Sequence, residues 1–137
     1  MASQGQTELR IDLTAADGTN AYETFQNFYL DNGPEYTFHI DLGTGTAGDD
    51  VSLYGLSYHN DQHFTTYDAD RDSDLQHNCA NHEHGGWWYN ACGGANLNGE
   101  YVTPGTAHPS GFWVGMIYHQ FKGEESLKTT KMMFRRV

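Results

Sequence analysis

Tyr67-Asp-Ala-Asp-Arg-Asp-Ser-Asp-Leu-Gln-His-Asn-Cys79 begins the stretch that decides the fold, which continues to Gly85-Gly-Trp-Trp-Tyr-Asn-Ala-Cys92. Its first part places aspartates at alternate positions, namely Asp68, Asp70, Asp72 and Asp74. Close carboxylates repel one another, so a folded loop with this charge density requires a cation. Hard oxygen ligands suit calcium better than zinc or iron. The stretch therefore predicts a calcium-binding loop, with the tryptophans as its local core.

Asp70 and Asp72 are the predicted side-chain ligands, because residues two apart in an extended loop can converge on one ion. Backbone carbonyls from residues 74–77, together with water, would complete the coordination shell. An EF-hand is excluded, because the sixth position of the acidic run is Ser73 rather than glycine and the twelfth is Cys79 rather than glutamate. A solvated acidic loop without an ion is the alternative.

The two cysteines, Cys79 and Cys92, enclose a segment rich in glycine, histidine and asparagine. A disulfide between them is favoured because this segment has little to pack it. Closing a loop of this size would stabilise the fold by roughly 3 kcal/mol, and the bond would imply an oxidising compartment. Two free buried thiols in an intracellular protein are the alternative.

Charge and composition exclude several classes of partner. The chain of 137 residues has 18 acidic and 7 basic residues, which gives a net charge of −11. This charge would repel phosphate backbones, so nucleic acid and anionic membrane surfaces are not expected partners. No apolar run approaches the roughly 20 residues of a membrane span. No G-x-S-x-G motif is present, and we expect no enzyme activity.

Alternation of apolar and polar residues predicts strands at both ends of the chain. Glu8–Leu13, Ala21–Leu30 and Glu35–Leu42 are expected to form an antiparallel meander. Ser126–Val137 carries apolar groups on both faces, which predicts a central strand that returns to the first sheet. Residues 61–111 keep no regular period, and such long irregular segments are uncommon without ligands or cross-links.

Histidines give a second possible metal cluster. His77, His82 and His84, with Glu83 between the last two, could hold zinc and activate a water for hydrolysis. Their order lacks the helical spacing of metalloproteases, and surface loop histidines are far more common. We therefore favour surface histidines over a zinc site.

Aromatic residues offer a possible ligand surface, because sugars and acetyl groups stack on such side chains. The candidates are Trp87, Trp88, Tyr89, Trp113, Tyr118 and Phe121. The alternative for the Trp87-Trp88 pair is that both rings belong to the core, and this interpretation is favoured.

Four motifs carry a family resemblance: Phe64-Thr-Thr-Tyr-Asp-Ala-Asp-Arg-Asp72, Asn78-Cys-Ala80, Gly86-Trp-Trp-Tyr-Asn-Ala-Cys92 and Asn96-Leu-Asn-Gly-Glu-Tyr101. In order and spacing they resemble the fibrinogen C-terminal (fibrinogen-related) domain. Upstream and downstream motifs extend the resemblance over nearly the whole chain. The family's N-terminal subdomain and first sheet strand have no counterpart before Gln6.

The resemblance implies an α+β fold in one domain: a twisted antiparallel sheet with few short helices, plus an irregular calcium-binding loop region clamped by a disulfide. The expected parts are a sheet part over 6–60, a calcium and ligand loop part over 61–123, and a returning strand over 124–137. Lack of the first strand would expose a sheet edge and favour homo-oligomers.

The two carboxylates of the family's calcium loop match Asp70 and Asp72. Two carbonyl ligands follow in the family, and the extra residue before the first cysteine leaves two alternatives. These are Asp74 with Gln76, or Leu75 with His77.

The family disulfide matches Cys79–Cys92, and the peptide bond before its second cysteine, here Ala91–Cys92, is often cis. Lectin-type members place a histidine directly after that cysteine to help hold an acetyl group, where this chain has Gly93. A Tyr-Ala pair that lines their pocket falls near Phe112-Trp113. Both departures weaken the acetyl-lectin interpretation without excluding another sugar-binding mode.

The run Ala91-Cys-Gly93, with Phe121-Lys-Gly123 and Met132-Met133, looks like the angiopoietin branch of the family. Those relatives bind a receptor tyrosine kinase through the same subdomain, with a contact segment that matches residues 113–124. The predicted ligand-binding residues are Ala91, Cys92, Gly93, Phe112, Trp113, Tyr118 and Phe121.

We therefore expect a secreted, extracellular recognition module that depends on calcium and binds carbohydrate or acetylated ligands. A protein-receptor ligand of angiopoietin type is the first alternative. A structural or adhesive module with a purely stabilising calcium is the second. The expected partner is a glycan, an acetylated ligand or a cell-surface receptor, without insertion into a membrane.

Overall fold

The computed structural model describes residues 7–52, 54–111 and 113–137. It confirms an α+β fold, mostly antiparallel sheet with few short helices. The strands are β1 (Thr7–Thr14), β2 (Asn20–Gln26), β3 (Tyr29–Leu30), β4 (Phe38–His39), β5 (Thr44–Gly45), β6 (Ala95–Asn96), β7 (Ile117–Tyr118) and β8 (Thr129–Arg136). The helices are the 3-10 helix η1 (Leu56–His59), α1 (Cys79–Glu83) and α2 (His119–Lys122).

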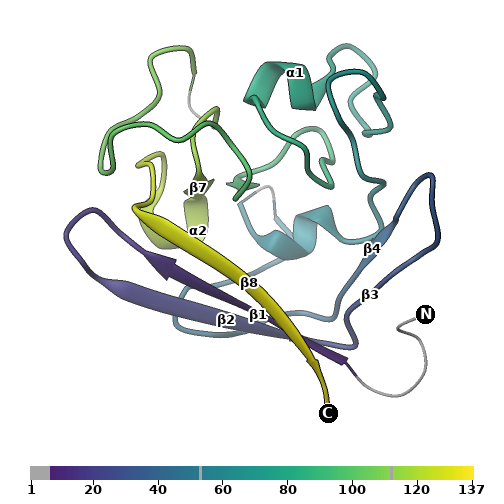
Figure 1. Ribbon diagram of the computed structural model, residues 1–137, viewed down its shortest axis with the longest axis horizontal. Coiled ribbons are helices and arrows are strands. Elements are labelled where there is room, and N and C mark those ends of the chain that lie inside the picture. Colours follow the sequence, from purple (N-terminus) through teal and green to yellow (C-terminus); the bar gives the residue numbers. More distant parts are fainter. Residues whose placement is uncertain (1–6, 53, 112) are drawn as a thin grey trace.

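The largest sheet has the strand order β5-β2-β1-β8, with antiparallel neighbours throughout. Alternation places Leu9, Ile11 and Leu13 of β1 on its inner face, where all three are buried. Leu9 pairs with Phe25 of β2 on one side and with Phe134 of β8 on the other. Figure 1 shows these strands crossing the molecule as one twisted layer, with the loop region of residues 61–123 above them.

The C-terminal strand does not lie in the middle of the sheet, so the prediction of a central strand is wrong. Within the described ranges β8 pairs with β1 alone and forms an edge. Its apolar residues are partly exposed, and the Phe134 side chain is 68% exposed. Phe134 packs against Phe28, with ring centroids 5.7 Å apart, at the rim of the core.

The predicted meander is wrong in its third strand. The segment expected as one strand over 21–30 breaks at Asn27, whose φ of 54° lies in the left-handed region. The chain then forms β3, which pairs with β4 in a separate sheet, whereas β5 occupies the place beside β2. As a result Phe38 is buried, but Leu42 of the same predicted strand is exposed.

One apolar core joins the sheet to the loop region. Ile11 and Phe25 from the sheet and Trp87, Tyr89 and Tyr118 from the loop region are all fully buried. The irregular segment is therefore packed on the sheet's inner face rather than loosely attached. None of the helices in the described ranges has the length and hydrophobicity of a membrane span.

Candidate functional site

The alternate aspartates build the acidic loop by bonding to the main chain two residues further on. Asp70 Oδ1 accepts the N–H of Asp72 at 3.3 Å, and Asp72 Oδ1 accepts the N–H of Asp74 at 3.0 Å. Asp74 Oδ1 accepts the N–H of Gln76 at 2.9 Å. Each contact is an Asx turn, so the spacing of two has a local structural cause. The sequence was not interpreted as a series of Asx turns, although aspartates at alternate positions are the pattern that such turns produce.

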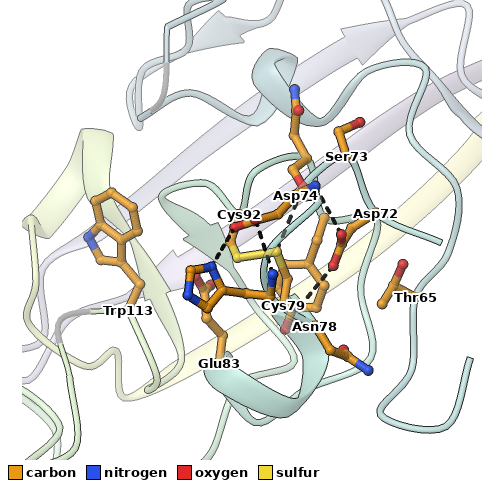
Figure 2. The surroundings of a disulfide bond; sticks show 12 residues. Thr65, Asp72, Ser73, Asp74, Asn78, Cys79, Glu83, Cys92 and Trp113 are labelled. Carbon is orange, nitrogen blue, oxygen red and sulfur yellow. Dashed lines mark hydrogen bonds and ion pairs between the residues drawn. A yellow bond between two sulfur atoms is a disulfide. The ribbon is translucent and has the colours of Figure 1, made fainter. Parts of the chain in front are cut away.

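Asp72 joins the acidic loop to α1. Its Oδ2 accepts the N–H of Cys79, the first residue of the helix, at 2.8 Å (Figure 2). Partial burial raises the pKa of Asp72, and the negative charge of Asp70 beside it raises the pKa further. The charge of Asp70 therefore makes it harder to ionise Asp72, and a cation beside them would relieve this repulsion.

The loop also presents free main-chain oxygens. Among the described residues, no donor reaches the carbonyl groups of residues 74–77. The Asp74 carboxylate itself accepts N–H groups from Gln76 and His77, and the Leu75 side chain is 98% exposed. Two neighbouring carboxylates and free carbonyls are the oxygen donors that a calcium ion takes in a flexible loop. The residues at this position therefore fit calcium.

Cys79 and Cys92 form a disulfide, with an S–S distance of 2.07 Å and a Cα–Cα distance of 5.5 Å. The alternative of two free thiols is therefore wrong. Asn78 caps α1 with its side-chain oxygen, which accepts the N–H of Asn81 at 3.2 Å. Figure 2 shows the bond at the centre of the site, with Asp72 on one side and Trp113 on the other.

A pocket of about 220 Å³ lies beside the disulfide. It is lined by Asp74, His77, His82, Glu83, Cys92 and Trp113. Glu83 is 2% exposed, and its Oε1 receives no hydrogen bond from the described residues. Burial raises the pKa of Glu83 to about 9, with a further contribution from the charge of Asp72. At neutral pH Glu83 is therefore a neutral carboxylic acid, and a ligand group that donates to its free oxygen or accepts its O–H would satisfy it.

The predicted ligand-binding residues do not form one surface. Cys92 and Trp113 line the pocket, and Ala91 is exposed next to it. Tyr118 is fully buried, and its hydroxyl donates to the Gly48 carbonyl at 2.7 Å, so it belongs to the core. Phe121 packs against the same core from α2. Phe112 lies outside the described residues.

Gly93 packs directly against the ring of the buried His59. A Cβ atom at this position would lie 2.5 Å from Cε1 and Nε2 of His59, and its φ is 118°. His59 Nδ1 donates to the Trp88 carbonyl at 2.9 Å, which fixes the ring in place. A side chain after the second cysteine, as in lectin-type members, therefore has no room. The expected cis bond at Ala91–Cys92 is absent, since the only cis peptide bond within the described residues joins Gly33 to Pro34.

The tryptophan pair lies in the core, whereas the three histidines lie in two different places. Trp87 is fully buried and Trp88 stacks on Phe38, with ring centroids 4.7 Å apart, so the pair belongs to the core as favoured. The rings of His77 and His82 lie 6.2 Å apart near the pocket. His84 instead faces Glu100, and its Nδ1 lies 2.7 Å from Glu100 Oε1.

Asn96 connects the parts of the loop region, a role that the sequence did not assign although Asn96 opens one of the four family motifs. Its Nδ2 donates to the carbonyls of Glu83 and Trp113, both at 2.9 Å, and lies 3.3 Å from that of Gly115. Its Oδ1 accepts the Tyr89 hydroxyl at 2.7 Å. This fully buried amide therefore holds α1 against the segment that carries Trp113. No local pattern marks such a residue.

Comparison with known families matches residues 1–137 to the family described as "Fibrinogen beta and gamma chains, C-terminal globular domain". The curated relative Angiopoietin-1 of Canis lupus familiaris is 40% identical over 139 residues, which cover 98% of this chain. The chain spans about a quarter of that relative, 26% of its length.

Two solved structures share the fold. The fibrinogen-like globe domain of human ANGPTL2 superposes with a TM-score of 0.87 and 34% identity, over 98% of this chain and 60% of that one. The corresponding domain of human ANGPTL6 gives a TM-score of 0.85 and 35% identity, over 99% of this chain and 59% of that one.

Proposed function

The chain belongs to the family of C-terminal globular domains of fibrinogen β and γ chains, and on this premise we propose that it is an extracellular protein-recognition domain of angiopoietin type. In this role it binds a cell-surface receptor and catalyses no reaction. The observation that carries the proposal is the 40% identity with Angiopoietin-1 over 98% of the chain. The Cys79–Cys92 disulfide supports a location outside the cell, where such bonds persist.

The pocket beside the disulfide is the proposed anchor point for the partner. Glu83 offers a buried oxygen that lacks a donor, and Trp113 offers an aromatic wall. A basic or amide side chain of a receptor could supply the missing N–H while its stem packs on the indole. Aromatic and buried polar residues of this kind form the hot spots of protein interfaces.

Binding of acetylated sugars has less support. The position that carries a histidine in lectin-type members is Gly93, and His59 occupies the space that such a side chain would need. The receptor alternative is therefore favoured over the carbohydrate function that the sequence first suggested.

We further propose that calcium occupies the acidic loop, held by Asp70, Asp72 and main-chain carbonyls of residues 74–77. The ion would neutralise the two carboxylates and fix the loop that borders the pocket. Because each Asx turn already shapes the loop, calcium would stabilise this conformation rather than create it.

Calcium removal tests this proposal. Calcium at about a hundred times its Kd should stabilise the wild-type protein by about 2.7 kcal/mol, measured by denaturant unfolding with and without chelator. Asp70→Asn should abolish this difference. Asp68→Asn is the matched control, since Asp68 bonds to Thr66 in the same acidic run and should keep the calcium effect. An equal calcium effect in wild type and Asp70→Asn would reject the site.

Receptor binding is tested with a panel of immobilised receptor tyrosine kinase ectodomains. We expect one of them to bind the calcium-loaded chain, and Trp113→Ala and Glu83→Leu, which removes the acceptor oxygen, each to weaken binding by about tenfold or more. Tyr22→Ala, at an exposed position on the sheet, is the control and should bind normally. Retention on an acetylated resin, with elution by acetylated sugars, would instead support the carbohydrate function.

A further inference from the structure

Two histidines and one glutamate meet beside the C-terminal end of α1. His84 Nδ1 lies 2.7 Å from Glu100 Oε1, and His108 Nε2 lies 3.2 Å from Glu100 Oε2. The two imidazole rings are almost perpendicular, with centroids 5.5 Å apart. One nitrogen of each histidine and one oxygen of Glu100 lie within 4.8 Å of one another. A single ion could therefore contact all three side chains.

The main chain holds the three residues from different directions. His84 is the left-handed C-cap of α1, with φ 59° and ψ 44°. Glu100 forms a parallel bridge with Gly115, and its N–H donates to the Val114 carbonyl at 3.1 Å. Asn96 bonds to both sides, at the carbonyls of Glu83 and Gly115, so it fixes His84 next to Glu100.

The loop that carries His108 is also anchored. Gly105 donates to the Ser126 carbonyl at 2.9 Å, and Ser126 donates back to Thr106 at 2.9 Å. The His108 side chain is only 5% exposed, so its ring has little freedom. Few rotamers must therefore be fixed for the three side chains to act together on one ion.

Two imidazole nitrogens and a carboxylate are the donor set of many zinc sites with three protein ligands. Nitrogen donors suit zinc and neighbouring transition metals, whereas calcium takes oxygen ligands alone. We propose that His84, Glu100 and His108 form a transition-metal site, selective for zinc over calcium and separate from the acidic loop of residues 68–77.

Metal binding requires each imidazole to carry its proton on the nitrogen that faces away from the ion. Ser110 now donates its N–H to His108 Nδ1 at 2.9 Å, so Nε2 carries the proton and donates to Glu100. On binding, the proton moves to Nδ1 and this hydrogen bond is lost. Ser110 is exposed, so its N–H then bonds to water. His84 shifts its proton to Nε2 in the same way.

The site would keep a coordination position open to solvent, because three protein groups leave the tetrahedral shell of zinc incomplete. His84 is 40% exposed and also lines a second pocket of about 440 Å³, together with Asn81, Gly85 and Gly86. A water molecule, or a carboxylate or imidazole of a partner, would complete the shell. Zinc would thereby link α1 to the 100–108 segment.

Zinc chloride titrated calorimetrically into the calcium-loaded, disulfide-bonded chain tests the proposal. We expect one zinc ion per chain, and His84→Asn, which tolerates the left-handed conformation, should weaken binding by about tenfold or more. His108→Gln should do the same. Cobalt titrated in place of zinc should give the visible absorption of a tetrahedral ion in the wild type, and His84→Asn should lose it.

Two controls separate this site from the others. His77→Asn removes a histidine outside the cluster and should leave zinc affinity unchanged. Asp70→Asn should also leave it unchanged, although it removes the proposed calcium effect. The proposal is overturned if the folded wild type binds no zinc at about 100 μM, a weak Kd for a protein site. It is also overturned if His84→Asn and His108→Gln bind zinc as the wild type does. In that case the three residues form only a hydrogen-bonded cluster.

Discussion

In the sheet, main-chain ladders between β1, β2 and β8 hold the strands, and the side chains mainly fill space. In the loop region of residues 61–123, by contrast, side chains bond to the main chain where regular ladders are short or missing. Asp70, Asp72 and Asn96 are the main examples. Both regions are packed on one core, so the difference lies in how main-chain polar groups are satisfied.

This difference predicts how each region responds to substitution. A strand tolerates an exchange between apolar residues of similar volume, because its hydrogen bonds come from the backbone. In the loop region one substitution can remove several hydrogen bonds at once, since a single side chain serves several main-chain groups. The position of Trp113, the proposed recognition residue, therefore depends on Asn96, a polar residue that lies elsewhere in the sequence.

The largest expected effect is that of Asn96→Ala. It leaves the carbonyls of Glu83 and Trp113 and the Tyr89 hydroxyl without their partner, so we expect a loss of about 4 kcal/mol in the free energy of unfolding. Asn98→Ala is the control, because its one bond to the Gly86 carbonyl is exposed, and it should lose less than about 1 kcal/mol. Hydrogen exchange should rise in the loop region first. An equal rise in β1 would show that the sheet and the loop region do not differ in this way.

Removal of the disulfide comes next. Cys79→Ala combined with Cys92→Ala should lower the free energy of unfolding by about 3 kcal/mol, because the bond closes a loop between residues 13 apart. Amide exchange should increase in residues 67–92, whereas β1 and β2 should stay protected. Uniform loss of protection would show that the two regions unfold as one unit.

Acidification should destabilise the fold through His59. Complete burial lowers the pKa of His59 from 6.5 to about 4. Between these values the unfolded chain takes up a proton that the folded chain excludes. The unfolding free energy should therefore fall by about 3 kcal/mol as the pH drops from 6.5 to 4. His59→Gln should remove this part of the pH dependence in denaturant unfolding, and an NMR titration of the His59 ring near pH 6.5 would contradict it.

The smallest effect is expected at Gly93. Gly93→Ala should cost about 2 kcal/mol, because the new methyl group meets the His59 ring and the φ of 118° is strained. Gly18→Ala is the matched control: its φ is also positive, at 87°, but its Cβ would meet nothing within 4 Å. The difference between the two melting curves measures mainly the contact with His59, with a smaller part from Tyr58, whose ring would lie 3.1 Å from the new Cβ. Equal losses of stability in the two variants would show that the His59 ring moves aside to make room for the methyl group.

Sequence patterns predicted the parts of the fold that follow from local chemistry. The alternation of Leu9, Ile11 and Leu13 predicted β1, and the two cysteines predicted the disulfide. The edge position of β8 was not predicted, because strand order depends on pairing between residues far apart in the chain. Asn27 ended a predicted strand through its positive φ, which polar periodicity does not reveal.

For the candidate site, the sequence grouped residues that lie close along the chain. It missed residues that come from distant segments and meet only in the folded structure. Asp70 and Asp72 share one loop, and the charge of Asp70 acts on Asp72, while their role as calcium ligands stays a prediction. His84, Glu100 and His108 come from separate segments, and the sequence instead grouped His84 with its neighbours. Tyr118 was expected at the ligand surface, but hydrophobicity alone cannot separate a buried aromatic ring from one that lines a pocket.

The contact between Gly93 and His59 also constrains how this chain can evolve. A larger residue at position 93 becomes acceptable only after position 59 has become smaller, so the order of mutations matters. A lineage that starts from this sequence would reach a histidine after the second cysteine through an intermediate that first loses the buried imidazole. The reverse order passes through a protein destabilised by the contact with His59 as well as by the strained φ, so it is the less favourable route.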